Sequence, residues 1–536
     1  MTVFLLLLSV VILVCVLFNK LASKAGIPTL LVFIILGMVF GSDGIFKIPF
    51  DNFFLAEQIC TVSLILIMFY GGFGTRWSEA KPVAAKSILL STLGVFLTAG
   101  LTGLFCYFVL RIDLLESLLI GSVISSTDAA SVFSILRYKK LGLIENTASM
   151  LEIESGSNDP CSYMLTSVVL SAMSGKATAG MVVKMVFEQI FYGILFGVII
   201  AFITVKFLRS FKFAAPGFDS VFVLAVALLS YSVPAFLGGN GYLSAYIVGI
   251  IIGNAGIPNK RQMVHFFDGT TGLMQMLIFF LLGLLAFPSQ FPSILLPSIA
   301  IALFLTIVAR PLAVFAVLAP AKCSIRQQLL VSFSGLRGAA SIVFAIMAVS
   351  SEAYTKNDVF HIVFFIVLLS ISFQGTLIPF AAKKLNMIDK EANVLKTFND
   401  YIEEVDVQFI KFSITANHPW LGKLLREIEL PPDSLLVMLI RNNHALIPTG
   451  NTKLKENDVA VLSAPAFQDK LDLKLYELKI TADSVWQGKK ISEFSPSPDQ
   501  LVLLIKRQGK NIIPRGHTVI QANDLLVIYS YSPSSL

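Results

Sequence analysis

The chain has 536 residues, of which 55% are hydrophobic and only 14% are charged. Its mean hydropathy is +0.78. Soluble domains carry about 25% charged residues, so this composition excludes a soluble protein and indicates one that crosses a membrane many times. The net charge of +7 is explained by basic loops on one side of the membrane and gives no reason to expect a nucleic-acid partner.

Apolar runs of about 20 residues predict an α-helical polytopic membrane protein with about thirteen transmembrane helices. The runs lie near residues 3–19, 28–42, 53–74, 85–110, 114–136, 147–174, 180–208, 219–237, 241–255, 263–287, 292–319, 327–350 and 358–382. Lys and Arg cluster in alternate loops, for example at 137–140 and 383–390. Because basic loops are retained in the cytoplasm, we expect the N-terminus outside and the C-terminal tail inside a bacterial inner or plasma membrane.

The sixth predicted span contains an acidic run that is costly in a bilayer. Glu152, Glu154 and Asp159 fall within two helical turns, and each acidic side chain at the bilayer centre costs about 2.5–3.5 kcal/mol on insertion scales. Glu154 and Asn158 are four residues apart, as are Ser155 and Asp159, so on a helix they form one polar stripe. The stripe must face protein or water, and we interpret it as a functional site.

Two spans, the fifth and the twelfth, are rich in small and polar residues and resemble each other. Asp128 precedes Ala-Ala-Ser-Val-Phe, and Arg337 precedes Gly-Ala-Ala-Ser-Ile-Val-Phe. Paired interrupted helices of this kind are typical of transporters built from inverted repeats, here spans 1–6 against 8–13. Small residues can also serve close helix packing, but that alternative leaves Asp128 and Arg337 without a purpose in the membrane.

Other polar residues of the spans are assigned structural roles. Lys184 and Glu188, four residues apart near the end of a span, are expected to pair or to extend their charged ends toward the membrane surface. Asp268 is expected to be interfacial, and Arg310, which precedes Pro311, to mark a kink near the cytoplasmic side.

Three motifs together resemble a known family. Ser-Ser-Thr-Asp-Ala-Ala at 125–130, Glu-Ser-Gly-Ser-Asn-Asp-Pro at 154–160 and Gly-Leu-Arg-Gly-Ala at 335–339 are similar to those of the monovalent cation/proton antiporters, within them the NhaP-type, cell-volume-regulation branch of potassium/proton antiporters. The resemblance covers the membrane part, 1–385. It implies thirteen helices, a transport core in which spans 5 and 12 unwind and cross, and a homodimer.

The resemblance also implies roles for individual residues. Asp159 would bind cation and proton in turn, with Asn158 as its partner. Thr127, Asp128 and Ser155 would complete the cation/proton site, and Glu154 and Arg337 would form a structural ion pair between spans 6 and 12. No catalytic residue, resident metal or enzymatic activity is implied. Relatives of this branch often carry an acid where this chain has Tyr70, before Gly71-Gly72, which leaves the role of that acid open here.

The chemistry of the residues leads to the same mechanism. A carboxylate that is withdrawn from water is more stable with a bound proton or cation than as a bare charge. A proton and a cation therefore compete for Asp159. Asn158 adds no second titrating group, and we therefore expect electroneutral exchange of H⁺ for K⁺, with Na⁺ as the alternative ion. A potassium channel of another class would need a filter such as Thr-Val-Gly-Tyr-Gly, which the sequence lacks. A sensor that transports nothing would not need paired broken helices.

After about Leu385 the composition becomes mixed in charge, and the tail repeats itself at an offset of 66 residues, as Trp420/Trp486 and Asp458/Asp524 show. We expect a linker over 386–410 and two lobes over 411–466 and 477–536. Each should be a small α/β unit, with a helix where Leu421, Leu424, Leu425 and Ile428 have helical spacing and strands near 435–440, 445–448 and 459–462.

The two lobes resemble the C-terminal lobe of the regulator-of-potassium-conductance module (RCK_C, or TrkA-C). The nucleotide-binding half is not expected, because no strand followed by Gly-x-Gly-x-x-Gly occurs in the tail. The resemblance implies regulation by a ligand, in some bacteria cyclic di-AMP. A dimerising tail without a ligand is the alternative, and no other cofactor is expected.

Overall fold

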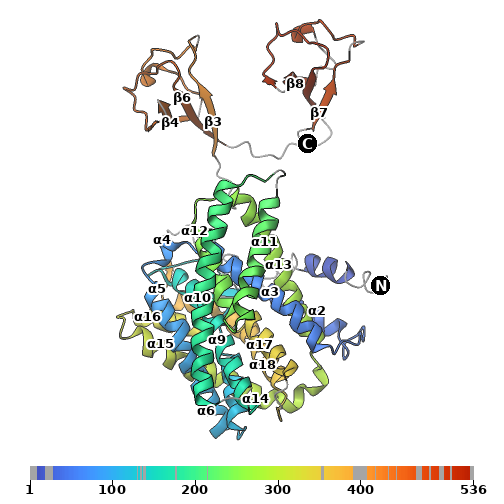
Figure 1. Ribbon diagram of the computed structural model, residues 1–536, viewed down its shortest axis with the longest axis vertical. Coiled ribbons are helices and arrows are strands. Elements are labelled where there is room, and N and C mark those ends of the chain that lie inside the picture. The colour runs from blue at the N-terminus through green and yellow to red at the C-terminus, as the bar shows by residue number, and fades with distance from the viewer. Residues whose placement is uncertain are drawn as a thin grey trace. The chain divides into compact units, whose positions relative to one another are not determined.

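The computed structural model consists of two compact units, Met1–Glu403 and Glu404–Leu536, which we describe separately (Figure 1). It describes residues 9–18, 28–128, 131, 132, 136, 141–175, 178–213, 215, 217–351, 355–389, 407–416, 418–431, 434–441, 444–465, 474–481, 484–493, 500–507 and 510–530. The first unit is a bundle of helices, and the second consists of β-sheets.

The helices of the first unit follow the predicted spans closely. They are Ser9–Phe18, α2 (Thr29–Phe40), α3 (Phe53–Gly74), α4 (Trp77–Ala80), α5 (Ala84–Leu89), α6 (Val95–Phe108), α7 (Leu114–Val123), α9 (Thr147–Met173), α10 (Ala179–Ser210), α11 (Phe218–Phe236), α12 (Gly241–Asn254), α13 (Lys260–Leu284), α14 (Phe291–Phe304), α15 (Arg310–Leu318), α16 (Ile325–Phe333), α17 (Ala339–Ser350), α18 (Val359–Leu369) and α19 (Thr376–Lys384). In the described part, seven helices are long and apolar enough to cross a membrane, and several more are shorter and apolar.

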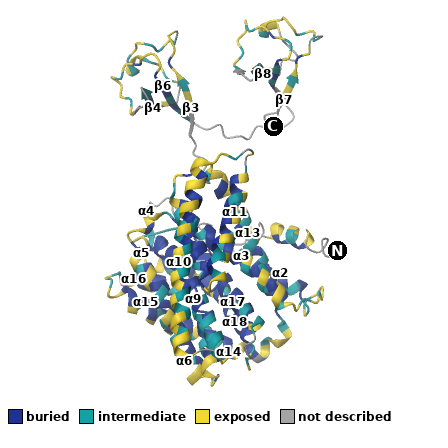
Figure 2. Cartoon of the chain, viewed as in Figure 1, coloured by how far each residue is buried: buried dark blue, intermediate teal, exposed yellow. Residues whose placement is uncertain are grey.

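The surface of the bundle is apolar, as expected for helices that contact lipid. Figure 2 shows buried residues inside the bundle and exposed ones on its outer faces. On α10, Val183, Phe202 and Ile203 are exposed, whereas Lys184 and Glu188 form the predicted pair, with Nζ and Oε1 3.7 Å apart. Exposed apolar faces on long helices are typical of proteins that are embedded in a membrane.

Three long helices contain π-helical segments, at Leu90–Gly94 (η1), Leu305–Ala309 (η3) and Ser370–Gly375 (η4). The first two lie in the fourth and eleventh predicted spans, each immediately before the broken helix of its half. This correspondence agrees with the inverted repeat that the sequence predicts. π-helical turns widen a helix locally and are frequent near functional sites.

The fifth and twelfth spans are interrupted and cross. The helix α7 ends at Val123 and is followed by non-helical backbone, and 334–338 separate α16 from α17. The backbone N–H of Asp128 donates a 2.8 Å hydrogen bond to the carbonyl of Leu336. The guanidinium of Arg337 donates from Nη1 to the carbonyls of Ser125 (2.9 Å) and Ser126 (2.6 Å). The predicted crossing of broken helices is therefore confirmed.

Glycines set the close packing of α3 on α12. A Cβ on Gly72 would collide with the backbone of Tyr246, and one on Gly249 with the backbone of Phe69. The two helices approach closely because neither carries a side chain at these points, which is a common way of packing membrane helices. The helices α3, α12 and α13 thereby form one wall of the site described below.

Each lobe of the tail is a four-stranded antiparallel sheet with the same strand order. The first has the order β3 (Val407–Ser413), β6 (Val459–Pro465), β4 (Leu435–Arg441), β5 (His444–Leu446). The second has the order β7 (Lys474–Lys479), β10 (Leu525–Ser530), β8 (Gln500–Arg507), β9 (Lys510–Ile512). The sheets begin at Val407 and Lys474, slightly before the predicted lobes. The repeated sequence thus folds into a repeated structure.

The helix predicted over Leu421–Ile428 is wrong. The segment forms turns and one 3₁₀ turn, Leu425–Glu427. Gly422 has a φ of +79°, and the backbone N–H groups of Gly422 and Leu425 donate to the carbonyls of Leu454 and Thr452 instead of to the preceding turn. Leu421, Leu425 and Ile428 pack against the buried cluster of the lobe without lying on a helix.

One ion pair recurs in both lobes. Arg441 contacts Asp458, with Nη2 and Oδ2 2.7 Å apart, and Arg507 contacts Asp524 at the same distance. Asp458 is buried and also accepts from the backbone N–H of Lys455. The hydrogen bond from Arg441, above all, holds the pKa of Asp458 below its ordinary value. The pair stabilises the loop that leads into β6.

We expect Asp458→Asn to lower the unfolding free energy of the tail by about 1.5–3 kcal/mol at pH 7, because the variant loses charge-assisted hydrogen bonds. The pKa of Asp458 is lower in the folded lobe than in the unfolded chain. Its stabilisation is therefore present above about pH 4 and is lost as the pH falls through the folded pKa. Urea unfolding of residues 404–536, followed by circular dichroism at pH 7 and pH 3, measures both effects.

The control for this prediction is Glu456→Gln, which makes the same kind of change at an exposed position two residues away. The control should unfold like the wild type at both pH values. Equal stability of the Asp458→Asn variant and the wild type at pH 7 would contradict the prediction.

Candidate functional site

The helix α9 carries the acidic run into the middle of the bundle, beside the crossing. Glu154 and Asn158 are fully buried, and Ser155 and Asp159 are partly buried. Pro160 lies inside the helix, and because proline has no N–H, the carbonyl of Gly156 receives no hydrogen bond from the next turn. The predicted polar stripe therefore faces other parts of the protein.

The interrupted backbone after α7 is held against this stripe. Ser155 Oγ donates to the carbonyl of Thr127 (2.8 Å), and Asn158 Nδ2 donates to Thr127 Oγ1 (2.6 Å). Ser126 Oγ donates to Asp159 Oδ1. The structure thus brings Thr127, Ser155, Asn158 and Asp159 together, as the sequence predicts.

Asp128 lies where the two breaks meet. Its carboxylate accepts hydrogen bonds from the backbone N–H (3.2 Å) and the hydroxyl (2.5 Å) of Ser131. A Cβ on Gly338 would collide with this carboxylate. The glycine after Arg337 therefore makes room for Asp128, which explains why the motif of the twelfth span needs so small a residue at this point.

These residues line a cavity of about 260 Å³. One wall consists of Ser126–Asp128, Glu152, Ser155, Gly156, Asp159 and Gly338–Ala340, and the other includes Tyr70 of α3, Tyr246 of α12, and Asp268, Thr271 and Gln275 of α13. Among the described residues, the lining contains four carboxylates, on Asp128, Glu152, Asp159 and Asp268, and no Lys, Arg or His. A water molecule occupies about 30 Å³, so the cavity can hold a partly hydrated monovalent cation, and its charge attracts one.

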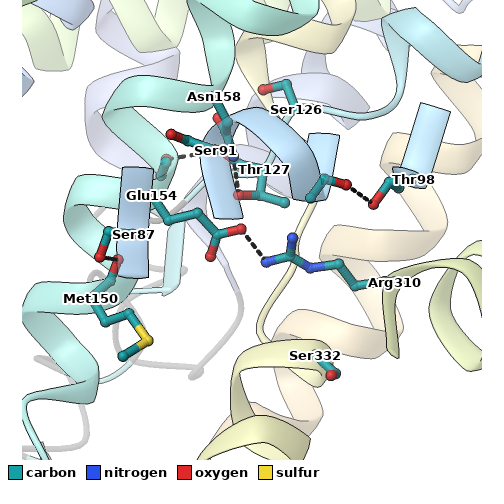
Figure 3. Close-up of polar contacts among 12 residues, drawn as sticks. Ser87, Ser91, Thr98, Ser126, Thr127, Met150, Glu154, Asn158, Arg310 and Ser332 are labelled. Atoms are coloured by element: carbon teal, nitrogen blue, oxygen red, sulfur yellow. Dashed lines mark hydrogen bonds and ion pairs between the residues drawn. The ribbon is translucent and has the colours of Figure 1, made fainter. Parts of the chain in front are cut away.

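The partner of Glu154 is not the one that sequence reasoning predicts. The salt bridge joins Glu154 Oε1 to Arg310 Nη2 at 2.5 Å, and both side chains are buried. In Figure 3 the two side chains point toward each other, beside Thr127 and Asn158. The predicted pair with Arg337 is wrong because Arg337 points its Nη1 to the carbonyls of Ser125 and Ser126.

For two residues of the site the sequence predicts other roles. It predicts that Arg310 marks a kink, although a charge in the apolar run 292–319 is itself a signal of function. Asp268 was expected to be interfacial; it is exposed on α13, but it also lines the cavity and accepts a 3.3 Å hydrogen bond from the hydroxyl of Tyr70.

Comparison with known proteins agrees with this geometry. The family described as sodium/hydrogen exchanger, transmembrane, matches residues 8–384, and the TrkA-C domain matches residues 409–466 and 475–533. Among curated proteins, a protein of Alkalimonas amylolytica named K(+)/H(+) antiporter NhaP is 33% identical over 461 residues, which cover 84% of this chain and 79% of that protein. K(+)/H(+) antiporter NhaP2 of Shewanella sp. (strain MR-4) is 31% identical, over 83% of this chain and 78% of that protein.

The fold also matches a solved structure. The sodium proton antiporter MjNhaP1 from Methanocaldococcus jannaschii, determined at pH 8, superimposes with a TM-score of 0.64 at 24% sequence identity. The match covers 70% of this chain and 97% of that one, and it shows a shared transporter fold. The chain therefore belongs to the sodium/hydrogen exchanger family of cation/proton antiporters, and it carries two TrkA-C domains in its tail.

Proposed function

We propose that the protein exchanges K⁺ for H⁺ at Asp159, one for one, with Na⁺ as the alternative cation. The observation that carries the proposal is the position of Asp159, in an acidic cavity where the two broken helices cross. The choice of K⁺ is supported by relatives named K(+)/H(+) antiporters that are 31–33% identical over most of the chain. The TrkA-C domains of the tail point in the same direction.

The surroundings of Asp159 allow two exclusive states. In one, the carboxylate is charged and binds a cation together with nearby oxygens, such as those of Ser126 and Ser155. In the other, the carboxyl group is protonated and the site holds no cation. A bare charge is costly to move through the membrane, so the site crosses readily only when it is occupied by the cation or the proton. This requirement makes the transport an exchange.

The proton carried per turnover comes from one group. The neighbour of Asp159 on the stripe is Asn158, an amide that does not titrate and that bonds Thr127. Asp128 accepts two hydrogen bonds from Ser131 and exchanges no proton in this scheme. One proton on Asp159 is therefore replaced by one monovalent cation, and the exchange moves no net charge.

The carboxylate of Asp159 is expected to be essential. In proteoliposomes with a pH-sensitive dye, addition of K⁺ or Na⁺ to the wild type should drive proton movement. Asp159→Asn should reduce it to background, because an amide carries no negative charge to balance the cation and does not titrate. The control is Asp51→Asn, the same change at an exposed loop position. Cation flux that persists without proton movement in the Asp159 variant would favour the channel alternative.

Electroneutrality can be measured directly. On a solid-supported membrane, a jump in cation concentration should give no sustained current in the wild type, whereas a pH-sensitive dye should report proton movement under the same conditions. A current with a reversal potential that requires unequal numbers of cations and protons would contradict one-for-one exchange.

The Glu154–Arg310 ion pair supports the site without binding the ion. Both side chains are buried, with exposures of 1% and 2%, and neither lines the cavity. The pair joins α9 to the helix that begins at Arg310, directly after the π-helical segment η3. Removal of one member of a buried pair leaves the other charge uncompensated, which typically costs about 3–5 kcal/mol.

We therefore expect Glu154→Gln and Arg310→Gln each to lower both the amount of folded protein and its melting temperature. The double variant, which leaves no unpaired charge, should be more stable than either single variant. Size-exclusion chromatography and thermal unfolding in detergent measure stability, and the proteoliposome assay measures transport. Normal stability with lost transport in a single variant would show a direct role in transport instead.

The orientation we propose has the N-terminus outside and the tail in the cytoplasm of a bacterial cell membrane. Basic residues support it: Arg76 follows α3, Lys260 begins α13, and Arg137 precedes α9 in the sequence. Tyr70 and Glu152 lie near these ends of α3 and α9, and Asp268 lies in the same half of α13 as Lys260. In this orientation, the cavity is reached from the cytoplasm.

We further propose that the protein is a homodimer and that the tail regulates transport in response to a ligand, of which cyclic di-AMP is the candidate. The two TrkA-C matches support a regulatory tail, and the homodimer follows from the resemblance to the NhaP-type antiporters. Equilibrium binding of cyclic di-AMP to the purified chain decides between a ligand-binding tail and one that only dimerises.

A further inference from the structure

A polar strip runs along one face of α13. Exposed positions on this face include Arg261, His265, Asp268, Gly269 and Gly272. The opposite face packs its apolar residues, among them Met263, Val264 and Phe267, into a buried cluster with α3 and α12. A charged residue within a membrane helix normally faces protein or a water-filled space. The strip therefore faces water or protein rather than lipid, and two of its positions, Asp268 and Gly272, also line the cavity.

Asp268 is held in place on this strip. The hydroxyl of Tyr70 donates to Asp268 Oδ1 at 3.3 Å, and the ring of Tyr70 is 5% exposed and stacked on Phe267 at a centroid distance of 6.3 Å. A buried, stacked ring has little freedom, so its hydroxyl restricts the carboxylate to the side of the cavity. Asp268 is thus a positioned group, not a freely rotating surface acid.

A second, independent observation indicates that the cavity receives a polar ligand. Tyr246 of α12 lines it and is only 3% exposed. Within the described residues its hydroxyl makes no hydrogen bond of standard geometry, although the hydroxyls of Thr75 and Ser157 lie close enough to interact with it. Buried hydroxyls whose hydrogen bonding is incomplete usually bind a water, an ion or a ligand in native structures.

The two walls of the cavity contribute different groups. Asp159 and Glu152 are on α9, whereas Tyr70, Tyr246 and Asp268 are on α3, α12 and α13. All five offer oxygen atoms, and none of the described residues that line the cavity is basic. Hard monovalent cations are bound by oxygen, so a partly hydrated cation fits both the volume and the chemistry.

We propose that Asp268, positioned by Tyr70, captures the cation in the cavity before it reaches Asp159 and thereby sets the apparent affinity for the cation. The inference rests on the proposed exchange at Asp159 and assigns the cation a first binding position on a different wall. Asp268 carries no proton across the membrane in this scheme. Its substitution should change the concentration of cation that is needed, not the maximal rate.

The test measures proton movement in proteoliposomes as a function of K⁺ and Na⁺ concentration at low ionic strength. We expect Asp268→Asn to raise KM about tenfold, the lower limit of the effect of a charged cleft on local ion concentration, and to keep kcat within about twofold of the wild type. Asp268→Glu should restore most of the affinity. Tyr70→Phe keeps every charge but frees the carboxylate, and should raise KM by a smaller factor.

Two controls make the test specific. Glu79→Gln removes one negative charge at an exposed position of α4, outside the cavity, and should leave KM unchanged. An inert salt such as choline chloride should reduce the difference between Asp268→Asn and the wild type, because added ions screen the attraction. A purely structural role for Asp268 would show no such salt dependence.

An unchanged KM in Asp268→Asn, with or without a lower kcat, would overturn the proposal. If Asp268→Asn does not fold, Tyr70→Phe decides, and a wild-type KM in that variant counts against the proposal. A wild type that shows no cation-dependent proton movement would instead refute the exchange proposed for Asp159, so the two failures are distinguishable.

Discussion

The crossing of the two broken helices is the contact on which the rest of the membrane unit depends. Where α7 and α16 end, backbone carbonyls lose their helical partners inside the membrane unit, and each one left unsatisfied there would cost several kcal/mol. Arg337 supplies donors for two of these carbonyls, those of Ser125 and Ser126. A backbone hydrogen bond from Asp128 to Leu336 joins the two breaks directly. The guanidinium group of Arg337 thus stabilises the non-helical backbone at the crossing.

The consequence for function is a site built from oxygen atoms. Because Arg337 faces the carbonyls and Arg310 neutralises Glu154, both guanidinium groups are occupied outside the cavity. The cavity itself keeps a negative lining in which Asp159 meets the hydroxyl of Ser126. The positive charges that stabilise the crossing are thereby kept from competing with the transported cation.

The opposite wall shows how packing can introduce chemistry. Gly72 and Gly249 allow α3 and α12 to approach closely, and this approach brings the aromatic residues Tyr70 and Tyr246 to the cavity. A tyrosine cannot supply the negative charge of an acid, but its hydroxyl can donate a hydrogen bond to one, as that of Tyr70 does to Asp268. The negative charge on this wall comes from α13, a helix that the sequence gives no reason to connect with α3.

The sequence by itself determined the membrane class, the positions of the spans, the interruption of spans 5 and 12, the stripe from Glu154 to Asp159 and the 66-residue repeat of the tail. These features follow from hydropathy, local spacing and self-similarity, which are properties of the chain read in order. The tertiary structure alone decided that Glu154 pairs with Arg310, that Asp268 meets Tyr70, and that Leu421–Ile428 is not a helix. In each case the partners are far apart in sequence, and which of them come within hydrogen-bond distance depends on how the elements pack.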